Sequence, residues 1–374
     1  MRFAIIASEK DPAGLNIKDS LLGLFDFEES GDKFGGNSVF LLKNNSNVFE
    51  NNEKESDERG KNGERTEKIG NKQKTNGRKN EDKIIEKIKS GEKQEIKLYT
   101  ISSDLICSEN LDKKIEADIF IFASKHRAEA GIKTLCCHCI GNFGKADYGG
   151  KEKSVCPAPA FLLKNILIEL EKNGKGINHE IAIEATHHGP YMEKPAVFVE
   201  VGSNEENWGN KEAGNIVAKA IISALEDFYF SKGGENIIER NNETESNGEK
   251  ANNKKGDEKN NSKNNEKKTN KESNEKINLK NTEKKSALII GGSHYNHLAN
   301  KIMLSTDYAV GHICAKYNLE NLDIELVRQA MEKTIPNASL VLLDWKGLGK
   351  EKERIVKMLE ENNINCQRND KFFD

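Results

Sequence analysis

Short apolar runs alternate with amphipathic segments along most of the chain. Runs that suit buried strands lie at 2–7, 96–101, 117–123, 132–139, 181–183, 196–199, 287–290, 309–315 and 339–345. Between them, apolar residues recur at helical spacing over 158–171, 211–230, around 326–331 and over 350–361. Continuous apolar strands separated by helices are typical of a sheet that is covered on both faces. The pattern therefore predicts an α/β fold.

Two long polar blocks interrupt this alternation, at 44–95 and 233–285. They consist almost wholly of Asn, Lys, Glu, Ser and Gly. Such segments cannot bury enough apolar surface to offset the entropy lost on ordering, so we expect two disordered, low-complexity insertions. About 270 residues remain, which is enough for one large domain or two intimate lobes. We therefore expect a single domain over 1–374 that carries both insertions.

Composition and charge narrow the class of protein. Of 374 residues, 35% are hydrophobic and 32% charged, and the two polar blocks account for most of this imbalance. The net charge of -3 gives no global electrostatic case for nucleic-acid binding, although a local basic face can still contact phosphates. No apolar stretch approaches the length of a membrane span, and the first run is too short for a signal peptide. The seven cysteines form no regular framework and fit reduced thiols in a cytoplasmic protein.

The stretch 186–190, Thr-His-His-Gly-Pro, lies between two apolar runs, with Glu184 before it and Glu200 at the end of the following run. Histidine both binds divalent metals and moves protons near neutral pH. An isolated His-His pair is structural about as often as functional. Four other histidines change this balance, because they too lie near the ends of apolar strands: His126, His138, His294 and His312. Such clustering at strand ends predicts a shared cleft.

Imidazole nitrogens and carboxylate oxygens in that cleft form a ligand set that suits zinc. A catalytic zinc needs about three protein ligands and an open position for water. We expect His187, His188 and Glu200 to bind the metal, with Glu184 as the alternative carboxylate. Water bound to zinc loses its proton near neutral pH and can attack an ester carbonyl. The expected catalytic residues are His187, His188, Glu184, His294 and His138.

Two other motifs resemble known binding motifs but lack some of the features that those motifs require. The run 136–139, Cys-Cys-His-Cys, does not predict a zinc knuckle, because neighbours on a strand point to opposite faces and no second CxxC pair is present. We expect its cysteines to be small core side chains. The turn 291–295, Gly-Gly-Ser-His-Tyr, lacks the features of a P-loop or a dinucleotide fingerprint. We expect this turn either to hold the end of an RNA or to orient His294.

Further motifs follow one another in a recognisable order over nearly all of the chain outside the polar blocks. They are 122–127 (FASKHR), His138 with 141–144 (GNFG) and 146–150 (ADYGG), 184–190 (EATHHGP), 200–203 (EVGS) with Glu206 and Trp208, 291–295 (GGSHY), 311–312 with 316–317, and 343–348 (LDWKGL). Together they resemble the D-aminoacyl-tRNA deacylases of the archaeal and plant type.

This resemblance implies hydrolysis of the ester that joins a D-amino acid to the 3′ end of tRNA, a quality-control step in translation. It also implies Zn2+ as cofactor, a monomer, and a three-layer α/β/α fold with a mixed, mainly parallel sheet, akin to the phosphorylase and peptidyl-tRNA hydrolase group. D-aminoacyl-tRNA is the expected partner, in the cytoplasm, with no membrane and no DNA. The residues expected to contact substrate or tRNA are Lys125, His126, Arg127, Gly291, Gly292, Tyr295, His312 and Lys316.

Two other functions stay open. One is a metal-dependent peptidase or amidohydrolase that uses the same cleft for small substrates. The other is a tRNA-binding protein without turnover, in which the histidines are only structural ligands. The choice of substrate separates the first from a deacylase, and metal content with single-turnover deacylation separates the second. The two insertions carry none of the motifs, so we expect them to be dispensable.

Overall fold

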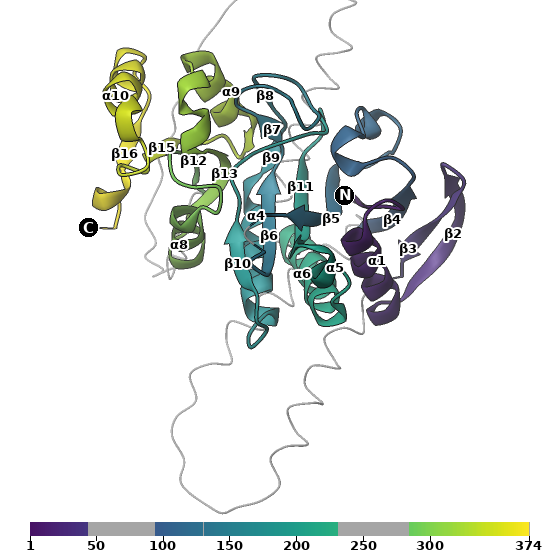
Figure 1. Ribbon diagram of the computed structural model, residues 1–374. Coiled ribbons are helices and arrows are strands. Elements are labelled where there is room, and N and C mark those ends of the chain that lie inside the picture. The colour runs from purple at the N-terminus through teal and green to yellow at the C-terminus, as the bar shows by residue number, and fades with distance from the viewer. Residues whose placement is uncertain (44–93, 130, 231–283, 374) are drawn as a thin grey trace, which may run out of the picture.

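The computed structural model describes residues 1–43, 94–129, 131–230 and 284–373 (Figure 1). The insertions expected at 44–95 and 233–285 lie almost wholly outside these ranges. In the described residues, strands and helices alternate as the apolar pattern predicts. The predicted α/β class with a mixed, mainly parallel sheet is confirmed.

An eight-stranded sheet forms the larger part of the fold, in the order β10-β6-β11-β5-β1-β4-β3-β2. Its strands are β1 (Arg2–Ser8), β2 (Phe27–Phe34), β3 (Asn37–Leu42), β4 (Glu95–Ile101), β5 (Ile119–Arg127), β6 (Thr134–Cys139), β10 (Glu180–Ile183) and β11 (Ala196–Ser203). The four strands β4, β1, β5 and β11 are parallel. Strand β6 runs antiparallel to β11 and parallel to β10, and the β2–β3 hairpin closes the opposite edge.

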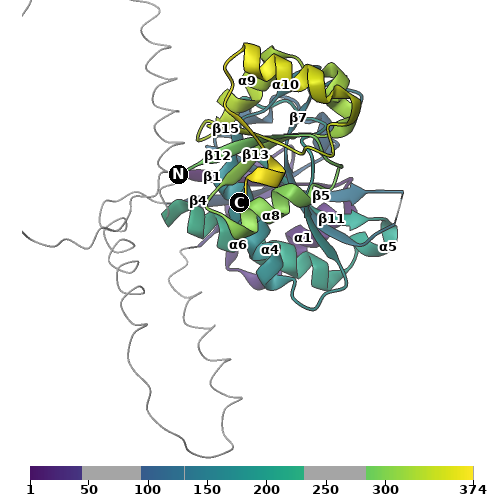
Figure 2. The same cartoon turned by 90° about the vertical axis from the view of Figure 1, so that its left-hand side faces the viewer.

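Alternate residues of each strand pack against different partners on the two faces of this sheet. On one face Ile119 and Ile121 of β5 join a core with the helices α1 (Pro12–Leu24), α4 (Ala160–Asn173) and α6 (Lys211–Phe230), which Figure 2 shows side by side. On the other face Phe120 and Phe122 pack in a smaller core with residues of the short 3-10 segments η1 (Leu105–Cys107) and η2 (Leu111–Lys113). Both faces are thus covered, as continuous apolar strands require.

The strands of the C-terminal part form a second, four-stranded parallel sheet, in the order β13-β12-β15-β16. They are β12 (Ser286–Ile290), β13 (Ala309–Cys314), β15 (Leu340–Leu343) and β16 (Cys366–Arg368). Ala287 and Ile289 face the core shared with α4 and α8 (His297–Ser305), while Leu288 and Ile290 face α9 (Ile324–Lys333) and α10 (Lys352–Glu361) (Figure 2). The apolar pattern located β12, β13 and β15 but not their separation from the larger sheet.

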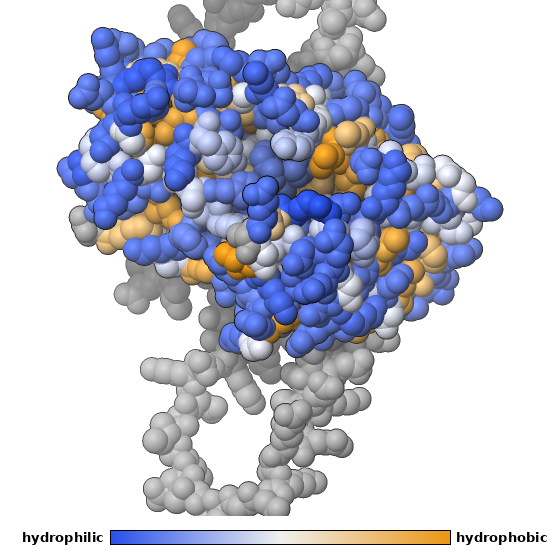
Figure 3. All heavy atoms as spheres, in the orientation of Figure 1, coloured by the Kyte–Doolittle hydropathy of each residue, from blue (hydrophilic) through white to orange (hydrophobic). Residues whose placement is uncertain are grey.

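Shorter elements complete the described residues. Strand β7 (Gly141–Asn142) pairs with β8 (Ser154–Val155), and β9 (Ala158–Pro159) pairs with β14 (Thr334–Ile335). The remaining segments are α5 (Glu205–Trp208), η3 (Lys316–Asn321), η4 (Gly349–Glu351) and η5 (Asn369–Lys371). In the described part of the chain no helix combines the length and apolarity needed to cross a membrane. The face seen in Figure 3 is mainly hydrophilic, with hydrophobic residues in small separate patches.

The two sheets meet beside β10, the edge strand of the larger one. The backbone N–H of Ala185 donates to the carbonyl of His294 over 2.8 Å, and that of Thr186 donates to Ile313 over 3.0 Å. Glu184 and Tyr295 also form an antiparallel bridge. The segment that follows β10 is therefore fixed by backbone hydrogen bonds to the second sheet, and this segment carries the paired histidines.

Candidate active site

Strand alternation places four polar side chains on the face of the large sheet that is opposite the helices. Along β5 and β11 the apolar residues Phe122 and Phe198 of this face are followed, at even spacing, by His126 and Glu200. On β6, His138 is the register partner of Phe198. Cys136 of β6 is the partner of Glu200. Because alternate residues of a strand share a face, these polar side chains continue the face that the apolar core occupies further back along the strands. They form a buried polar cluster near the strand ends.

The loop after β10 adds a carboxylate and two imidazoles to this cluster. Glu184 follows the strand and donates its N–H to the carbonyl of Cys137. The carbonyls of His187 and His188 both face the N–H of Gly141, at 3.4 and 3.1 Å. His188 has a φ of 46°, a conformation that non-glycine residues adopt rarely and that is concentrated at functional sites. The loop is therefore held on β7 with both side chains directed to β6.

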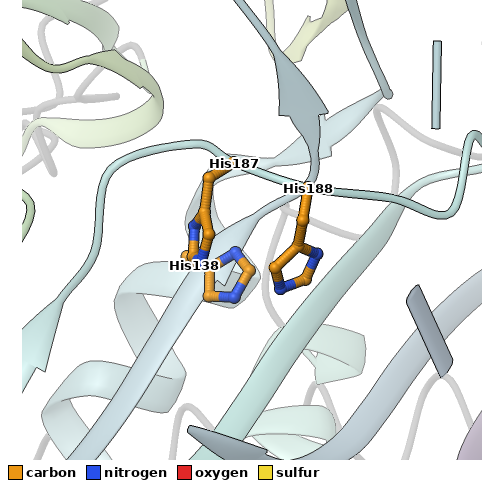
Figure 4. A group of neighbouring side chains, drawn as sticks. All are labelled: His138, His187 and His188. Atoms are coloured by element: carbon orange, nitrogen blue, oxygen red, sulfur yellow. The ribbon is translucent and has the colours of Figure 1, made fainter. Parts of the chain in front are cut away.

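Three imidazoles converge at this point: His138, His187 and His188 (Figure 4). One ring nitrogen of each lies within 4.8 Å of those of the other two. Each Nδ1 faces a backbone carbonyl, of Cys139, Ala185 and Gly189 respectively, at 3.1, 2.8 and 2.6 Å. A carbonyl only accepts, so each Nδ1 carries the proton and each Nε2 keeps a lone pair. Histidines that bind a metal through one ring nitrogen commonly donate from the other to a carbonyl in this way.

The pKa values of these imidazoles fit neutral ligands. Burial, reinforced by the neighbouring His188, lowers the pKa of His138 to about 3. Burial together with His138, His188 and His294 brings the pKa of His187 well below its ordinary value. The Nε2 of His138 is buried and has no hydrogen-bond partner. A buried nitrogen without a partner, beside two others with free lone pairs, fits a bound cation.

A second buried group lies next to the first and contains both carboxylates. The Nδ1 of His126 is 3.1 Å from Glu184 and 3.5 Å from Glu200, and its Nε2 is 2.7 Å from the hydroxyl of Tyr295. Cys136 completes a group whose ligand atoms all lie within 4.8 Å of one another. Burial opposes the charge on His126, but the two carboxylates outweigh it and raise its pKa. His126 is thus held between an acid pair and a tyrosine.

The two carboxyl groups differ in their affinity for a proton. Burial raises the pKa of Glu184 to about 8, partly offset by His126. Burial alone would raise the pKa of Glu200, but the hydrogen bond from His126 and the attraction between the two groups outweigh burial and lower it. Neither oxygen of Glu184 has a hydrogen-bond partner. Glu184 is therefore a buried carboxyl that can exchange a proton near neutral pH, which is the property of a general acid or base.

Glu184 also connects to the histidines of the loop and of the second sheet. Its Oε2 lies 3.9 Å from Nε2 of His187 and 3.7 Å from Nε2 of His294. The Nδ1 of His294 is 3.1 Å from the hydroxyl of Tyr317. His187, His188 and His294 open onto a cleft of about 270 Å³ that is also lined by Gly141, Asn142, Phe143, Gly144, Lys145, Asp147, Tyr148, Tyr317 and Asn318. A carboxyl, several imidazoles and an open cleft are together suited to hydrolysis.

The structure brings the five expected catalytic residues close together, and Glu184, the alternative carboxylate, groups with His187 and His294. Glu200 does not join His187 and His188 in a group of close ligand atoms; His138 does. The reason is register, since Glu200 lies opposite Cys136 and two residues further along β11 than the partner of His138. Glu200 instead lies beside His126.

Three expected substrate contacts lie elsewhere. His312 is fully buried, with Nε2 3.0 Å from the carbonyl of Cys156 and Nδ1 3.2 Å from the hydroxyl of Thr186, so both nitrogens are used inside the protein. Gly291 and Gly292 are also buried, with φ of 105° and 87°. The N–H of Gly291 donates to Cys314. These glycines let the chain turn so that His294 and Tyr295 reach the site.

The expected cationic residues lie outside the lining of the cleft. The guanidinium of Arg127 pairs with Glu205 over 2.7 Å and lies 5.0 Å from the ring of Trp208. The Nζ of Lys125 lies 5.6 Å from the same ring. Lys316 is exposed and precedes the lining residue Tyr317. Of the predicted contacts, Tyr295 and His126 lie in the buried network instead of on the open surface.

Sequence reasoning missed several residues of the site. It assigned all the cysteines of 136–139 to the core, and all three are buried, but it missed that Cys136 also lies beside His126 and the two carboxylates. The alternation with His138, two residues later, was the signal that Cys136 faces the polar cluster. Tyr317 and the cation Lys145 were also missed, because loop residues give no periodic signal.

Comparisons with known proteins identify the family to which this chain is similar. The family model described as D-aminoacyl-tRNA deacylase matches residues 113–242 and 257–367. The D-aminoacyl-tRNA deacylase of Thermococcus kodakarensis is 31% identical over 278 residues, which cover 72% of this chain and 82% of that one. That of Pyrococcus furiosus is 26% identical over 363 residues, 95% of each.

A solved structure agrees with these sequence matches. The crystal structure of the conserved protein of unknown function AF0625 superposes with a TM-score of 0.64 at 25% identity, and covers 99% of this chain and 96% of that one. The family match extends over more than half of the chain and includes the strands and loops that carry the histidines. The chain belongs to the D-aminoacyl-tRNA deacylase family.

Proposed function

We propose that this protein hydrolyses the ester bond of D-aminoacyl-tRNA with the help of a zinc ion held by His138, His187 and His188. Family membership supports the reaction. The observation that carries the metal assignment is the trio of Nε2 atoms, each opposite an Nδ1 that faces a backbone carbonyl. Three neutral imidazoles with room for a further ligand are a known catalytic zinc set.

Zinc bound there would lower the pKa of a water molecule and polarise the ester carbonyl. Glu184 is placed to accept the proton of the attacking water, because its Oε2 lies between His187 and His294 and its pKa is near neutrality. His294 lines the cleft with one nitrogen toward Glu184 and the other toward Tyr317. We assign it to the orientation of the ester and of the leaving ribose.

The buried network around His126 holds the carboxyl in place. Because the buried ring of His126 contacts Glu184, Glu200 and Tyr295, it fixes the position of the Glu184 side chain from inside the protein. The contact between Glu200 and His126 lowers the pKa of Glu200 and raises that of His126, so each favours the charged form of the other. These residues act by positioning, and we assign them no contact with substrate.

Two finer assignments belong to the same proposal. We expect hydrolysis of the D-enantiomer to be faster than that of the L-enantiomer, in agreement with the names of the relatives. We also expect the protein in the cytoplasm, where translation consumes aminoacyl-tRNA. A monomer is expected from the family resemblance.

Deacylation of D-Tyr-tRNA and L-Tyr-tRNA, measured with and without a zinc chelator, tests the proposal. We expect release of D-tyrosine that stops on chelation and returns with added zinc. His138→Asn should lose both bound zinc and activity, whereas His297→Asn, an exposed histidine outside the cluster, should keep both. Full activity in metal-free protein would overturn the zinc assignment, and failure of the native protein to release D-tyrosine would overturn the reaction.

The same samples discriminate the two other functions. Cleavage of a free D-amino-acid amide without deacylation of tRNA would indicate a peptidase or amidohydrolase. Binding of charged tRNA without release of the amino acid in a single-turnover assay would indicate a binding protein.

A further inference from the structure

Two tyrosines of the cleft expose their rings to solvent. Tyr148 is 72% exposed and Tyr317 is 49% exposed, and both line the cleft that contains His187, His188 and His294. They come from distant parts of the chain, one from the loop between β7 and β8 and the other from η3. Exposed aromatic side chains beside a reactive site commonly serve for binding.

The backbone that carries Tyr148 is fixed although its ring is exposed. The carbonyl of Tyr148 accepts a hydrogen bond from Gly189 over 3.0 Å. The next two residues are held as well, because the side chain of Asn142 donates to Gly149 over 2.9 Å and Gly150 donates to the carboxylate of Glu109 over 2.8 Å. The ring is therefore presented to solvent from a constrained loop instead of a free one.

The segment that carries Tyr317 is constrained too. The guanidinium of Arg354 on α10 donates to the carbonyl of Leu322 over 2.8 Å and to that of Leu319, which closes the end of η3. At the start of η3, the N–H of Lys316 donates to Gly292 over 2.9 Å. The backbone that carries each tyrosine is thus preorganised, which reduces the entropy lost when a ligand binds.

The cleft limits which part of an RNA can reach these rings. At about 270 Å³ it has no room for a duplex, so only an unpaired end can enter. An unpaired base presents a flat π face that stacks on aromatic side chains whatever its identity. Lys145, a cation in the same lining, offers a contact for the adjacent phosphate.

We infer that Tyr148 and Tyr317 form the binding platform for the terminal nucleobase of the RNA, beside the ester that the histidines and Glu184 process. This inference rests on the proposed function and assigns it a nucleobase site. Every tRNA ends in the same unpaired nucleotide, whereas the amino acid varies. A fixed aromatic platform therefore suits the base and is a poor general receptor for the amino-acid side chain.

Tyr148 gives the cleaner test, because Tyr317 also contacts His294. We would measure kcat and KM for D-Tyr-tRNA and D-Ala-tRNA with Tyr148→Ala and Tyr148→Phe. Removal of a stacked ring should raise KM about 5- to 100-fold for both substrates, with kcat within about twofold. Tyr148→Phe keeps the ring and should reverse most of the rise in KM of Tyr148→Ala, whatever the hydroxyl adds. Phe373→Ala, which removes a 38% exposed aromatic side chain outside the cleft lining, is the matched control.

Each outcome decides the inference. A KM effect confined to D-Tyr-tRNA would show that the ring contacts the amino-acid side chain, and would overturn the nucleobase assignment. Kinetic constants of Tyr148→Ala equal to those of Phe373→Ala would overturn it as well. Absence of turnover in the native protein would instead refute the proposed function. Far-UV circular dichroism and zinc content of each variant exclude misfolding as the cause of a change.

Discussion

The imidazole of His138 lies flat against the ring of Phe198, with ring centroids 5.3 Å apart and 7° between the planes. The two residues are register partners on β6 and β11. Phe198 in turn stacks on Phe122 of β5, at 4.7 Å and 13°. The sheet register thus sets the plane of the imidazole whose Nε2 is free, and so orients a proposed metal ligand through an apolar contact.

Phe198→Leu should weaken zinc binding without changing any ligand. The variant keeps an apolar core side chain but loses the flat contact with His138, so we expect zinc affinity to fall about 10-fold, as for other residues that orient metal ligands. Competition with a zinc-binding dye measures this change. Phe122→Leu removes aromatic stacking worth about 1 kcal/mol from the same core but does not stack on His138. Equal zinc affinity in the two variants would contradict the orienting role.

Glu184→Gln should separate catalysis from metal binding. Glutamine keeps the size of the protonated carboxyl but cannot accept the proton of water, so we expect kcat to fall about 100- to 10,000-fold. Zinc content should stay near that of the native protein, because the trio of imidazoles is unchanged. Rapid-quench deacylation with parallel metal analysis checks both. Unchanged kcat would remove Glu184 from the reaction.

Much of this fold could be predicted because apolar periodicity is a local signal. Helix α6 begins and ends at the predicted residues, since a long amphipathic stripe defines it. Helix α1 and the β2–β3 hairpin were not predicted. Helix α1 has an N-cap, Asp11 before Pro12, that could have been recognised. Strand β2 is an edge strand with mainly exposed residues, so it lacks the apolar run that identifies buried strands.

The members of the site were easier to predict than their pairing. The histidines lie near strand ends, which the sequence displays directly. Whether Glu200 or His138 joins His187 and His188 depends on the β6–β11 register, a relation between residues about 60 apart for which a single sequence carries no local signal. The buried position of His312 was not predicted for the same reason, because its partners Cys156 and Thr186 are distant in sequence.

Tyr317→Phe should lower kcat while leaving KM nearly constant. The hydroxyl that it removes lies 3.1 Å from Nδ1 of His294, whereas the ring that lines the cleft remains. Loss of one such hydrogen bond frees the orientation of His294, and we expect kcat to fall about 5-fold, which corresponds to about 1 kcal/mol. Steady-state kinetics with D-Tyr-tRNA measure it. A rise in KM with constant kcat would place the hydroxyl in substrate binding instead.

His312 should make the protein sensitive to acid. Its Nε2 donates to the carbonyl of Cys156 and its Nδ1 accepts from Thr186, so the folded protein requires the neutral ring. Burial lowers the pKa of His312 from 6.5 to about 3. Because the folded pKa is depressed, the stabilisation is complete above pH 6.5 and is lost as the pH falls toward 3, at up to about 1.4 kcal/mol per pH unit.

His312→Gln should therefore flatten the dependence of stability on pH between 6 and 4. Urea unfolding of chelator-treated protein at several pH values measures it, and metal release then plays no part. The buried His138 and His187 also resist protonation, so the native protein takes up several protons on unfolding, and the variant should take up about one fewer. Thr186→Val removes the hydroxyl but keeps the imidazole, and should retain the native pH dependence at lower stability. If His312→Gln and the native protein lose stability equally between pH 6 and 4, the ring of His312 is not the group that titrates.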